Sequence, residues 1–386
     1  MRPILFVLFS MCAAATSAAE VPTERIELKE LWRRGTDDDE ILLGNIARIL
    51  VDDEGNAYAL DSQLSEVQVF SPEGEHLRTI GRAGEGPGEF NSGADLYFGL
   101  GGKVGVLQAF PGKIIQLDRD GNPLENFRLP EIDGGGFQVV LRAQASDDRL
   151  YLAGTRQGRG DGGRMQRLYL ESYDADGNVI TKFHEEENPF QFGGMQYTEP
   201  KFVSFQRRWV VAPDGRVMAP LSYLDYQITV WKADGTVERV IEREDYEPLE
   251  RTGDEKKMLQ QLFEAITSFN PRSTFELSDT HPAISQMFAR EGGELWVLSS
   301  RGTHRAPEDV AFTLDVFDAQ GKMVREIEMI GDIDPQEDAM FLAGDRLFVV
   351  TGSLGATMSA LSAGGSEEEA LGDVEPSNIV CYSLGE

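Results

Sequence analysis

The sequence contains few cysteines, few histidines and few basic side chains for a chain of 386 residues. Of its 2 cysteines, only Cys381 lies outside the N-terminal segment described next, and a single cysteine excludes an internal disulfide framework. No Asn-x-Ser/Thr glycosylation site is present. The 66 acidic residues outnumber the 36 basic ones, so the net charge is −30. Such a charge repels polyanions and anionic lipid surfaces, and we therefore expect no nucleic-acid partner.

A long apolar run occurs only at the N-terminus, where Ile4 to Cys12 follows a short start that contains Arg2. Small residues come next, and Ser17-Ala18-Ala19 fits the small-x-small pattern of a cleavage site. We predict a signal peptide over residues 1–19 and a secreted or periplasmic mature chain from residue 20. Cleavage would remove one basic and no acidic residue, which makes the mature protein still more acidic. No other run is long enough for a transmembrane helix, so no transmembrane segment is expected.

Recognisable catalytic motifs are absent too. The sequence has no Gly-x-Ser-x-Gly and no Cys-x-x-Cys, and its 4 histidines are not spaced as a metal-binding pair on one strand or helix. The run Gly158-x-Gly160-x-x-Gly163 precedes a predicted strand, so it lacks the helix N-terminus that holds dinucleotide phosphates. The Asp-x-Asp-Gly-Asn segments at 118–122 and 174–178 lack the distal ligands of a calcium loop. We interpret them as hairpin turns, identify no cofactor and no metal-binding residue, and favour a non-enzymatic role.

Repetition is the strongest signal in the chain. Within residues 45–80, four short apolar or alternating segments are separated by turns, two of which contain Gly55 and Gly74. Four short strands joined in this way make one antiparallel sheet, the blade of a β-propeller. Related units occupy residues 95–129, 138–183, 205–242 and 284–328.

The last unit lacks one strand. Residues 339–342, 347–351 and 378–383 have strand character, while an alternating segment at 25–32 is left over near the start of the chain. If this segment pairs with 378–383, it supplies the fourth strand and covers an exposed sheet edge. We therefore predict an all-β fold, a six-bladed β-propeller over residues 20–386 whose last blade is closed by the N-terminal strand.

One stretch of the first unit resembles a known repeat. Residues 81–90 read Gly-Arg-Ala-Gly-Glu-Gly-Pro-Gly-Glu-Phe, and the preceding Ala59-Leu60-Asp61 and Val67-Gln68-Val69-Phe70 belong to the same pattern. The stretch resembles the NHL-type propeller repeat, and the chain is similar to the secreted bacterial six-bladed β-propellers, most of which lack an assigned activity. The resemblance therefore implies the fold and leaves the function open.

Two segments interrupt the repeats. Residues 252–270 carry apolar side chains at helical spacing, and we predict a helical insertion there. Residues 354–377 are rich in Gly, Ser and Ala and contain three consecutive glutamates. We predict a mobile acidic loop for this segment.

The turns of a propeller sort onto two edges of the ring. The turns between the first and second and between the third and fourth strands of each blade lie on one edge, here named the hairpin rim. The second-to-third turns and the links between blades lie on the other, the long-loop rim. Binding residues concentrate in long irregular loops on a rigid scaffold, and the long segments all belong to the long-loop rim: 81–94, 154–167, 184–204, 243–282, 300–310 and 353–377.

Basic residues gather in those segments despite the acidic total. We predict ligand contacts from Arg301, His304, Arg305, Arg82 and Arg156, because such a set can hold a carboxylate or a sulfate. The favoured hypothesis is a binding or interaction scaffold for a protein, peptide or glycan that docks on the long-loop rim. The alternative is a metal-dependent hydrolase or lyase with a divalent ion in the central channel. Local ion pairs with nearby acids remain the competing interpretation of the basic set.

Overall fold

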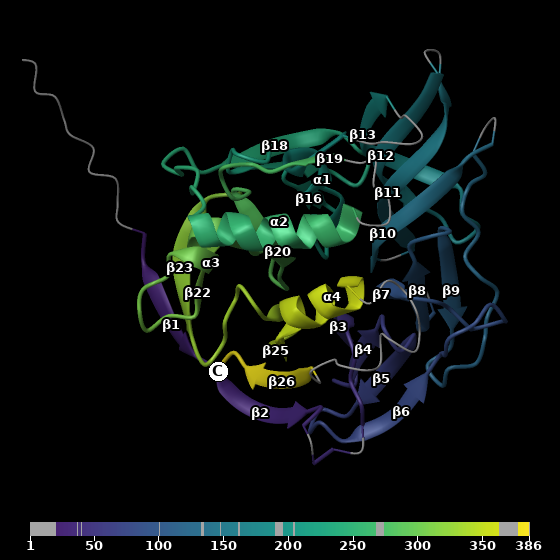
Figure 1. The fold of residues 1–386 in the computed structure, drawn as a ribbon, viewed down its shortest axis with the longest axis horizontal. Coiled ribbons are helices and arrows are strands. Elements are labelled where there is room, and N and C mark those ends of the chain that lie inside the picture. Colours follow the sequence, from purple (N-terminus) through teal and green to yellow (C-terminus); the bar gives the residue numbers. More distant parts are fainter. Residues whose placement is uncertain are drawn as a thin grey trace, which may run out of the picture.

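Each repeat of the sequence forms one sheet, and the sheets stand in a ring around a central channel (Figure 1). The computed structural model describes residues 21–36, 38–39, 41–99, 101–132, 135–146, 148–160, 163–189, 196–203, 205–267, 274–362 and 377–385. The predicted all-β, six-bladed propeller is confirmed. The predicted signal peptide, residues 1–19, lies outside the described residues. No helix in the described part of the chain has the length and apolar character needed to cross a membrane.

The blades follow the order of the chain. The first contains β3 (Ile46–Val51), β4 (Ala57–Asp61), β5 (Glu66–Phe70) and β6 (His76–Ile80), and the second contains β7 (Gly93–Gly99), β8 (Lys103–Gln108) and β9 (Lys113–Leu117). The third contains β10 (Phe137–Ser146), β11 (Arg149–Gly160), β12 (Gly163–Tyr173) and β13 (Val179–Pro189), and the fourth β15 (Val210–Val211), β16 (Val217–Ala219), β17 (Gln227–Trp231) and β18 (Val237–Glu242). The fifth contains β20 (Ile284–Ala289), β21 (Leu295–Ser299), β22 (Phe312–Phe317) and β23 (Met323–Ile330), and the sixth β24 (Ala339–Ala343), β25 (Arg346–Thr351) and β26 (Asn378–Ser383).

The ring is closed by the N-terminal segment, but not as a single strand. β2 (Lys29–Arg34) pairs antiparallel with β26 and completes the sixth blade, as predicted. The preceding β1 (Thr23–Glu27) pairs instead in parallel with β23 of the fifth blade, so the prediction of one strand over 25–32 is wrong. The chain changes partner at Leu28, whose N–H donates to the Ile330 carbonyl. β23 has an open outer edge, and β1 covers it because an unpaired edge is unfavourable.

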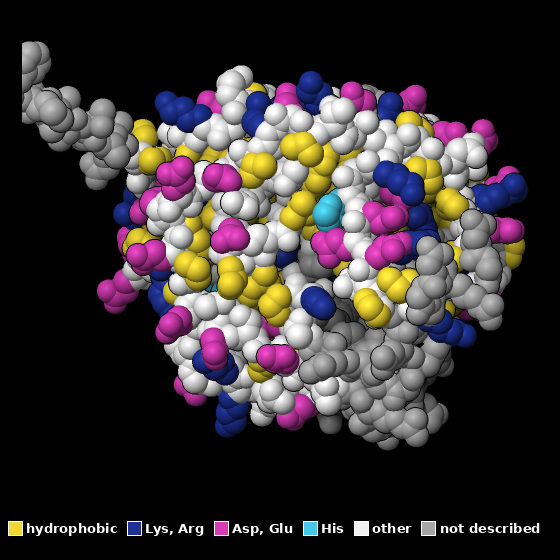
Figure 2. Space-filling model, turned by 90° about the horizontal axis from the view of Figure 1, so that it is seen from above, with side chains coloured by type: hydrophobic (Ala, Val, Ile, Leu, Met, Phe, Trp, Pro, Cys, Tyr) yellow, Lys and Arg dark blue, Asp and Glu magenta, His cyan; other side chains and the backbone are white. Residues whose placement is uncertain are grey.

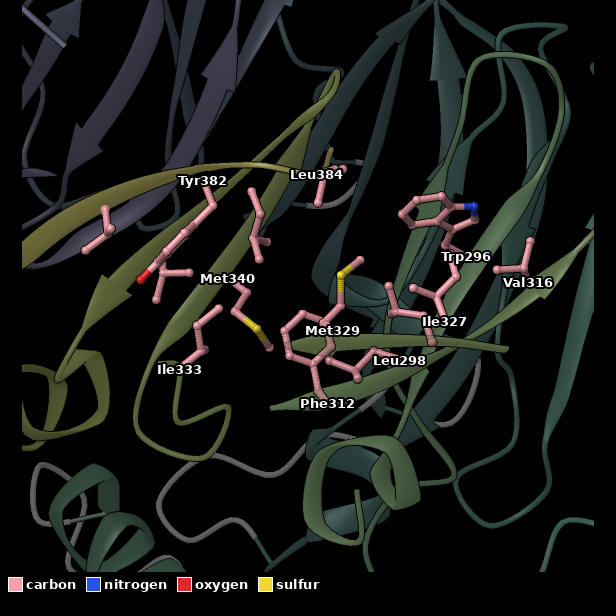
Figure 3. Close-up of a cluster of buried hydrophobic side chains, with 14 residues drawn as sticks. Trp296, Leu298, Phe312, Val316, Ile327, Met329, Ile333, Met340, Tyr382 and Leu384 are labelled. Atoms are coloured by element: carbon pink, nitrogen blue, oxygen red, sulfur yellow. The ribbon is translucent and has the colours of Figure 1, made fainter. Parts of the chain in front are cut away.

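Hydrophobic side chains fill the spaces between neighbouring blades. Figure 3 shows one such cluster between the fifth and sixth blades, which includes Trp296 and Met329 of the fifth blade and Met340 and Tyr382 of the sixth. All four side chains are at most 7% exposed. Because each cluster joins two blades, burial of apolar area couples every sheet to the next one.

Short helices lie on the long-loop rim. α2 (Gly253–Thr267) corresponds to the predicted insertion, and it packs on α4 (Ser353–Ser362) across the middle of the ring (Figure 1). α4 occupies the start of the segment predicted as a mobile loop, and residues 363–376 lie outside the described part. The remaining elements are α1 (Glu199–Phe202), the 3-10 helix η1 (Phe205–Arg207), α3 (Ser300–His304) and the parallel pair β14 (Gln196–Thr198) and β19 (Thr274–Glu276).

One predicted loop is regular. Residues 154–167 were expected to be irregular, yet β11 and β12 stay paired from Leu150 and Tyr173 out to Gly160 and Gly163. The two strands extend beyond the blade because they satisfy each other's backbone groups, which does not require an apolar pattern.

Candidate functional site

The five predicted contact residues lie on the long-loop rim but on different blades. Arg82, in the link after the first blade, lies with its Nη2 2.6 Å from Glu89 Oε1. Arg156, on β11 of the third blade, lies with its Nη2 2.7 Å from Glu171 Oε2 and also bonds the Tyr173 hydroxyl. These two arginines therefore already have carboxylate partners. On the side of the molecule seen in Figure 2, acidic and basic side chains also lie interspersed.

The other three predicted residues lie in and beside α3 of the fifth blade. Arg301 donates from Nε to the Glu247 carbonyl at 2.8 Å, and its guanidinium lies 5.9 Å from the centre of the Tyr246 ring. Arg305 follows the helix and donates from Nη1 to the His304 carbonyl at 2.7 Å. The His304 side chain contacts two residues that the sequence did not connect with it.

His304, His281 and Glu255 converge on the long-loop rim from three separate segments. His304 ends α3, His281 precedes β20, and Glu255 lies in the first turn of α2. Glu255 Oε1 is 3.4 Å from His304 Nδ1, and Glu255 Oε2 is 3.4 Å from His281 Nε2. The two rings lie 4.0 Å apart between centroids. Their side chains are at most 15% exposed, so this His₂Glu cluster is largely shielded from solvent.

Local hydrogen bonds fix Glu255. Its Oε2 accepts the Thr252 N–H at 2.6 Å, and the Thr252 hydroxyl accepts the Glu255 N–H at 3.3 Å. This reciprocal pair is the capping box of a Thr-x-x-Glu sequence, which begins α2 and holds the carboxylate in place.

A buried ion pair fixes the segments on either side of the cluster. Arg251 Nη2 is 2.6 Å from Glu199 Oε1, and both side chains are at most 5% exposed. Glu199 also accepts from the Tyr223 hydroxyl at 2.7 Å and from the Ser278 N–H at 3.0 Å. His281 N–H donates to the Leu249 carbonyl at 2.9 Å, which keeps the chain before α2 against the chain before β20.

The surroundings of the cluster keep both of its histidines neutral and its glutamate ionised. Burial, followed by the charges of His304 and Arg251, lowers the pKa of His281 to about 4. Burial also lowers the pKa of His304. Burial opposes ionisation of Glu255, but the hydrogen bonds from Thr252 outweigh it and the pKa of Glu255 falls to about 2. At neutral pH the cluster is therefore two neutral imidazoles and one carboxylate.

The central channel contains a second polar group. Its cavity has a volume of about 610 Å³ and is lined by the innermost strand of every blade. A β-bulge interrupts the pairing at the start of β3, β7 and β20 and in the middle of β10. Bulges re-aim the side chains that follow them, and the residues after these four bulges are Arg48, Asp95, Arg142 and Gln286.

Cations predominate in this channel. Among the described residues that line it, five are arginines and Asp95 is the one acidic residue. Asp95 Oδ1 lies 3.5 Å from Arg48 Nε, and its Oδ2 accepts the Ala143 N–H at 2.9 Å. Arg142 donates from Nη1 to the Arg207 carbonyl at 2.6 Å, while the Nε atoms of Arg48 and Arg142 are buried without a hydrogen-bond partner. The arginines that line the channel therefore carry more positive charge than the single carboxylate of Asp95 balances.

Burial acts directly on these guanidinium groups. It lowers the pKa of Arg142 to about 9, and the charge of Arg48 adds to this effect. Burial also lowers the pKa of Arg208 to about 10 and reduces that of Arg207. An anion in the channel would relieve this cost, whereas a divalent cation would increase it. The described residues of the channel thus suit an anion better than the metal ion of the alternative hypothesis.

Sequence reasoning missed both groups, for different reasons. Arg48, Asp95 and Arg142 are charged residues at corresponding positions of the first strands of successive blades, which was a usable signal. No sequence spacing connects Glu255, His281 and His304, because they belong to three separate segments.

The comparisons with known proteins concern the fold. Residues 36–214 match the DUF5128 family, described as a 6-bladed beta-propeller. No curated protein matches the chain. A DUF4221-family structure from Bacteroides vulgatus is similar at 12% identity and TM-score 0.53, over 93% of this chain and 98% of that one.

Two further structures are more distant. One is described as an exported protein of Bacteroides fragilis, with 14% identity, TM-score 0.45, and 95% and 100% of the two chains covered. The other is virginiamycin B lyase from Staphylococcus aureus, with 11% identity, TM-score 0.44, and 92% and 99% covered. At these identities the similarity concerns the fold alone, and the predicted resemblance to bacterial six-bladed propellers is confirmed.

Proposed function

Since the chain is a bacterial six-bladed β-propeller, we propose that it is an exported binding module that holds a small organic anion in its central channel. The observation that carries the proposal is the excess of arginine over carboxylate among the described residues that line that channel. Export rests on the signal-peptide pattern of residues 1–19. We place the site in the channel and not on the rim. On the rim, Arg82 and Arg156 are each paired with a carboxylate, whereas in the channel the arginines outnumber the carboxylates.

The chemistry of the channel defines the ligand class. Guanidinium groups bind carboxylates and phosphates through paired, charge-assisted hydrogen bonds. The lining also includes the apolar side chains of Met287, Phe288 and Phe341. A cavity of about 610 Å³ is within the usual range for small-molecule sites. The ligand we propose therefore combines an oxyanion with an apolar part. The acidic end of a peptide or a glycan also belongs to this class of ligand.

The net charge of the protein supports selective binding. A chain with net charge −30 repels anions from most of its surface, so a local cluster of positive charge is a specific feature. Buried like charges destabilise the folded protein unless something neutralises them. Binding of an anion would supply that neutralisation.

Citrate and phosphate serve as probes of this site, compared with chloride at constant ionic strength. We expect citrate to raise the melting temperature of the protein and to give a saturable isotherm in calorimetry. A ligand at 100 times its Kd stabilises the folded state by about 2.7 kcal/mol. In the double variant Arg48→Gln/Arg142→Gln, the affinity for citrate should fall at least tenfold, about 1.4 kcal/mol.

The matched control is Arg128→Gln, which removes an arginine whose side chain is 82% exposed. It should bind citrate as the unmodified protein does. Equal stabilisation of the unmodified protein and the double variant by citrate would exclude the channel site, because the anion would then act through the solvent or the surface.

A further inference from the structure

The His₂Glu cluster on the long-loop rim has the composition of a metal site. We propose that Glu255, His281 and His304 bind one zinc ion, which fastens α2 to the fifth blade. This inference is independent of anion binding in the channel, because it concerns other residues and the opposite charge of ligand. Two histidines and one glutamate are a known zinc ligand set that leaves a fourth position open.

The distances fit this ion. In a tetrahedral zinc site, ligand atoms at about 2.1 Å from the metal lie about 3.4 Å from one another. Each histidine nitrogen lies 3.4 Å from one of the two Glu255 oxygens, His281 Nε2 from Oε2 and His304 Nδ1 from Oε1. All three ligand atoms lie within 4.8 Å of one another, so the two imidazole nitrogens need to approach by at most about 1.4 Å.

The two nitrogen atoms that face the carboxylate are unsatisfied. His281 Nε2 and His304 Nδ1 are buried and have no hydrogen-bond partner. At 3.4 Å they are farther from the carboxylate oxygens than the 2.7–3.2 Å of a normal N–H···O bond. Buried polar atoms without a partner are costly, and a metal ion between the three groups would satisfy both nitrogens and the carboxylate at once.

The surroundings orient the ligands as a metal site requires. The backbone of His281 is held by its N–H, which donates to the Leu249 carbonyl at 2.9 Å, and His304 ends the short helix α3. Glu255 is fixed by the capping box with Thr252. The ligands are thus pre-arranged by three segments that already pack together.

The ion would join parts of the chain that are distant in sequence. Glu255 belongs to the insertion that crosses the ring in Figure 1, while His281 and His304 belong to the fifth blade. A metal that binds only the folded arrangement stabilises it in proportion to the logarithm of its concentration. Zinc should therefore act on the position of α2 rather than on the blades themselves.

The test uses the mature protein after dialysis against EDTA and then against metal-free buffer. Titration with zinc sulfate should give one equivalent per chain in calorimetry, and zinc should raise the melting temperature and slow hydrogen exchange in residues 253–259. Glu255→Gln, His281→Gln and His304→Gln should each weaken zinc binding at least 100-fold. The Gln variant at 255 keeps an oxygen for the Thr252 N–H, so the helix start is preserved.

The control variant is His184→Gln, because His184 Nε2 also lies 3.0 Å from a glutamate, Glu186, but has no third ligand in its described surroundings. It should bind zinc as the unmodified protein does. Absence of a stoichiometric isotherm in the unmodified protein would overturn the proposal. So would full zinc affinity in His281→Gln and His304→Gln, whatever their melting temperatures. Citrate binding is measured on metal-free protein from which the EDTA has been dialysed away, so that its outcome is separate from that of the zinc titration.

Discussion

The buried arginine side chains differ in what they face. Arg156 makes two hydrogen bonds to Glu171, whose side chain is only 1% exposed. Arg142 donates to a backbone carbonyl and lies near the like charge of Arg48. The first arrangement is an ion pair that the fold already completes, whereas the second leaves room for an external anion. Breaking the first should destabilise the protein, and neutralising the second should not.

Glu171→Gln tests the completed pair through its pH dependence. Burial opposes ionisation of Glu171, but the hydrogen bonds from Arg156 and Tyr173 keep its pKa below the ordinary value of 4.5. A pKa lowered by folding means that this carboxylate stabilises the protein above about pH 4.5 and that the effect is lost as the pH falls below it. In urea unfolding, the variant should be about 3 kcal/mol less stable at pH 7, and the difference should narrow towards pH 3.

Glu187→Gln is the control for this measurement, because its ion pair with Arg167 is nearly half exposed on both sides. Removing an exposed pair should change stability by less than about 1 kcal/mol. A difference between the unmodified protein and Glu171→Gln that stays constant from pH 7 to pH 3 would contradict the role given to the Glu171 carboxylate.

Among the elements, α2 has the strongest connection to a candidate site. Its N-terminal cap is Thr252, and the same capping box holds Glu255 towards the two histidines. Helix formation and ligand geometry thus depend on one pair of hydrogen bonds.

Thr252→Ala should remove this cap and destabilise α2 by about 1 kcal/mol. Faster amide hydrogen exchange in residues 253–259, measured by mass spectrometry, is the expected result. The control is Thr236→Ala, since the Thr236 hydroxyl bonds only within its own hairpin turn to Asp234. Unchanged exchange in α2 of Thr252→Ala would show that packing against α4, and not the cap, holds the start of the helix.

The sequence predicted the strands of the blades well and the irregular parts less well. Apolar alternation with glycine turns marked the four segments of the first blade, and β3 to β6 occupy the same residues. Residues 154–160 are polar and glycine-rich, yet they continue β11, because their partner strand supplies the hydrogen bonds. The change of partner at Leu28 was also not predictable, since alternation shows that a segment is a strand but not which edge it joins.

The candidate sites, too, were predictable from the sequence only in part. His304 and the long-loop rim were identified from the sequence, because the position of a turn within a blade fixes its side of the ring. The partners of His304 come from α2 and from the link before β20, and only the packed structure brings them together. Arg48 and Arg142 occupy corresponding positions in the first strands of their blades, which the sequence shows, but the bulges that re-aim their side chains leave no clear sequence pattern.

At the scale of the whole molecule, stability depends on how the ring is closed. Trp32 on β2 is 6% exposed, and its ring lies 5.7 Å from that of Phe70 in the first blade and 5.8 Å from that of Phe348 in the sixth. Its indole N–H donates to the Pro72 carbonyl at 3.2 Å. One side chain therefore attaches the closing strand both to the rest of its own blade, the sixth, and to the first blade.

Trp32→Ala should lower the free energy of unfolding by about 3–5 kcal/mol, because it removes a large buried aromatic side chain. Leu31→Ala is the control, since Leu31 is 43% exposed and its loss should cost less than about 0.5 kcal/mol. Deleting residues 20–33 should destabilise the ring by several kcal/mol, whereas deleting 20–27 removes only the mostly exposed β1. Equal melting temperatures for both deletions would contradict closure by β2.

The pairing of β2 with β26 also determines how the protein responds to mechanical force. Lys29 lies opposite Ser383 and Arg34 lies opposite Ile379, so the outward ends of the two strands leave the sheet at the same edge. Tension applied to both ends of the chain would first have to detach β1 from β23, and would then load the hydrogen bonds of the β2–β26 pair one after another instead of all together. In a protein tethered at one end and pulled at the other, β1 would therefore separate first and the last blade would open next, although a buried tryptophan closes the ring thermodynamically.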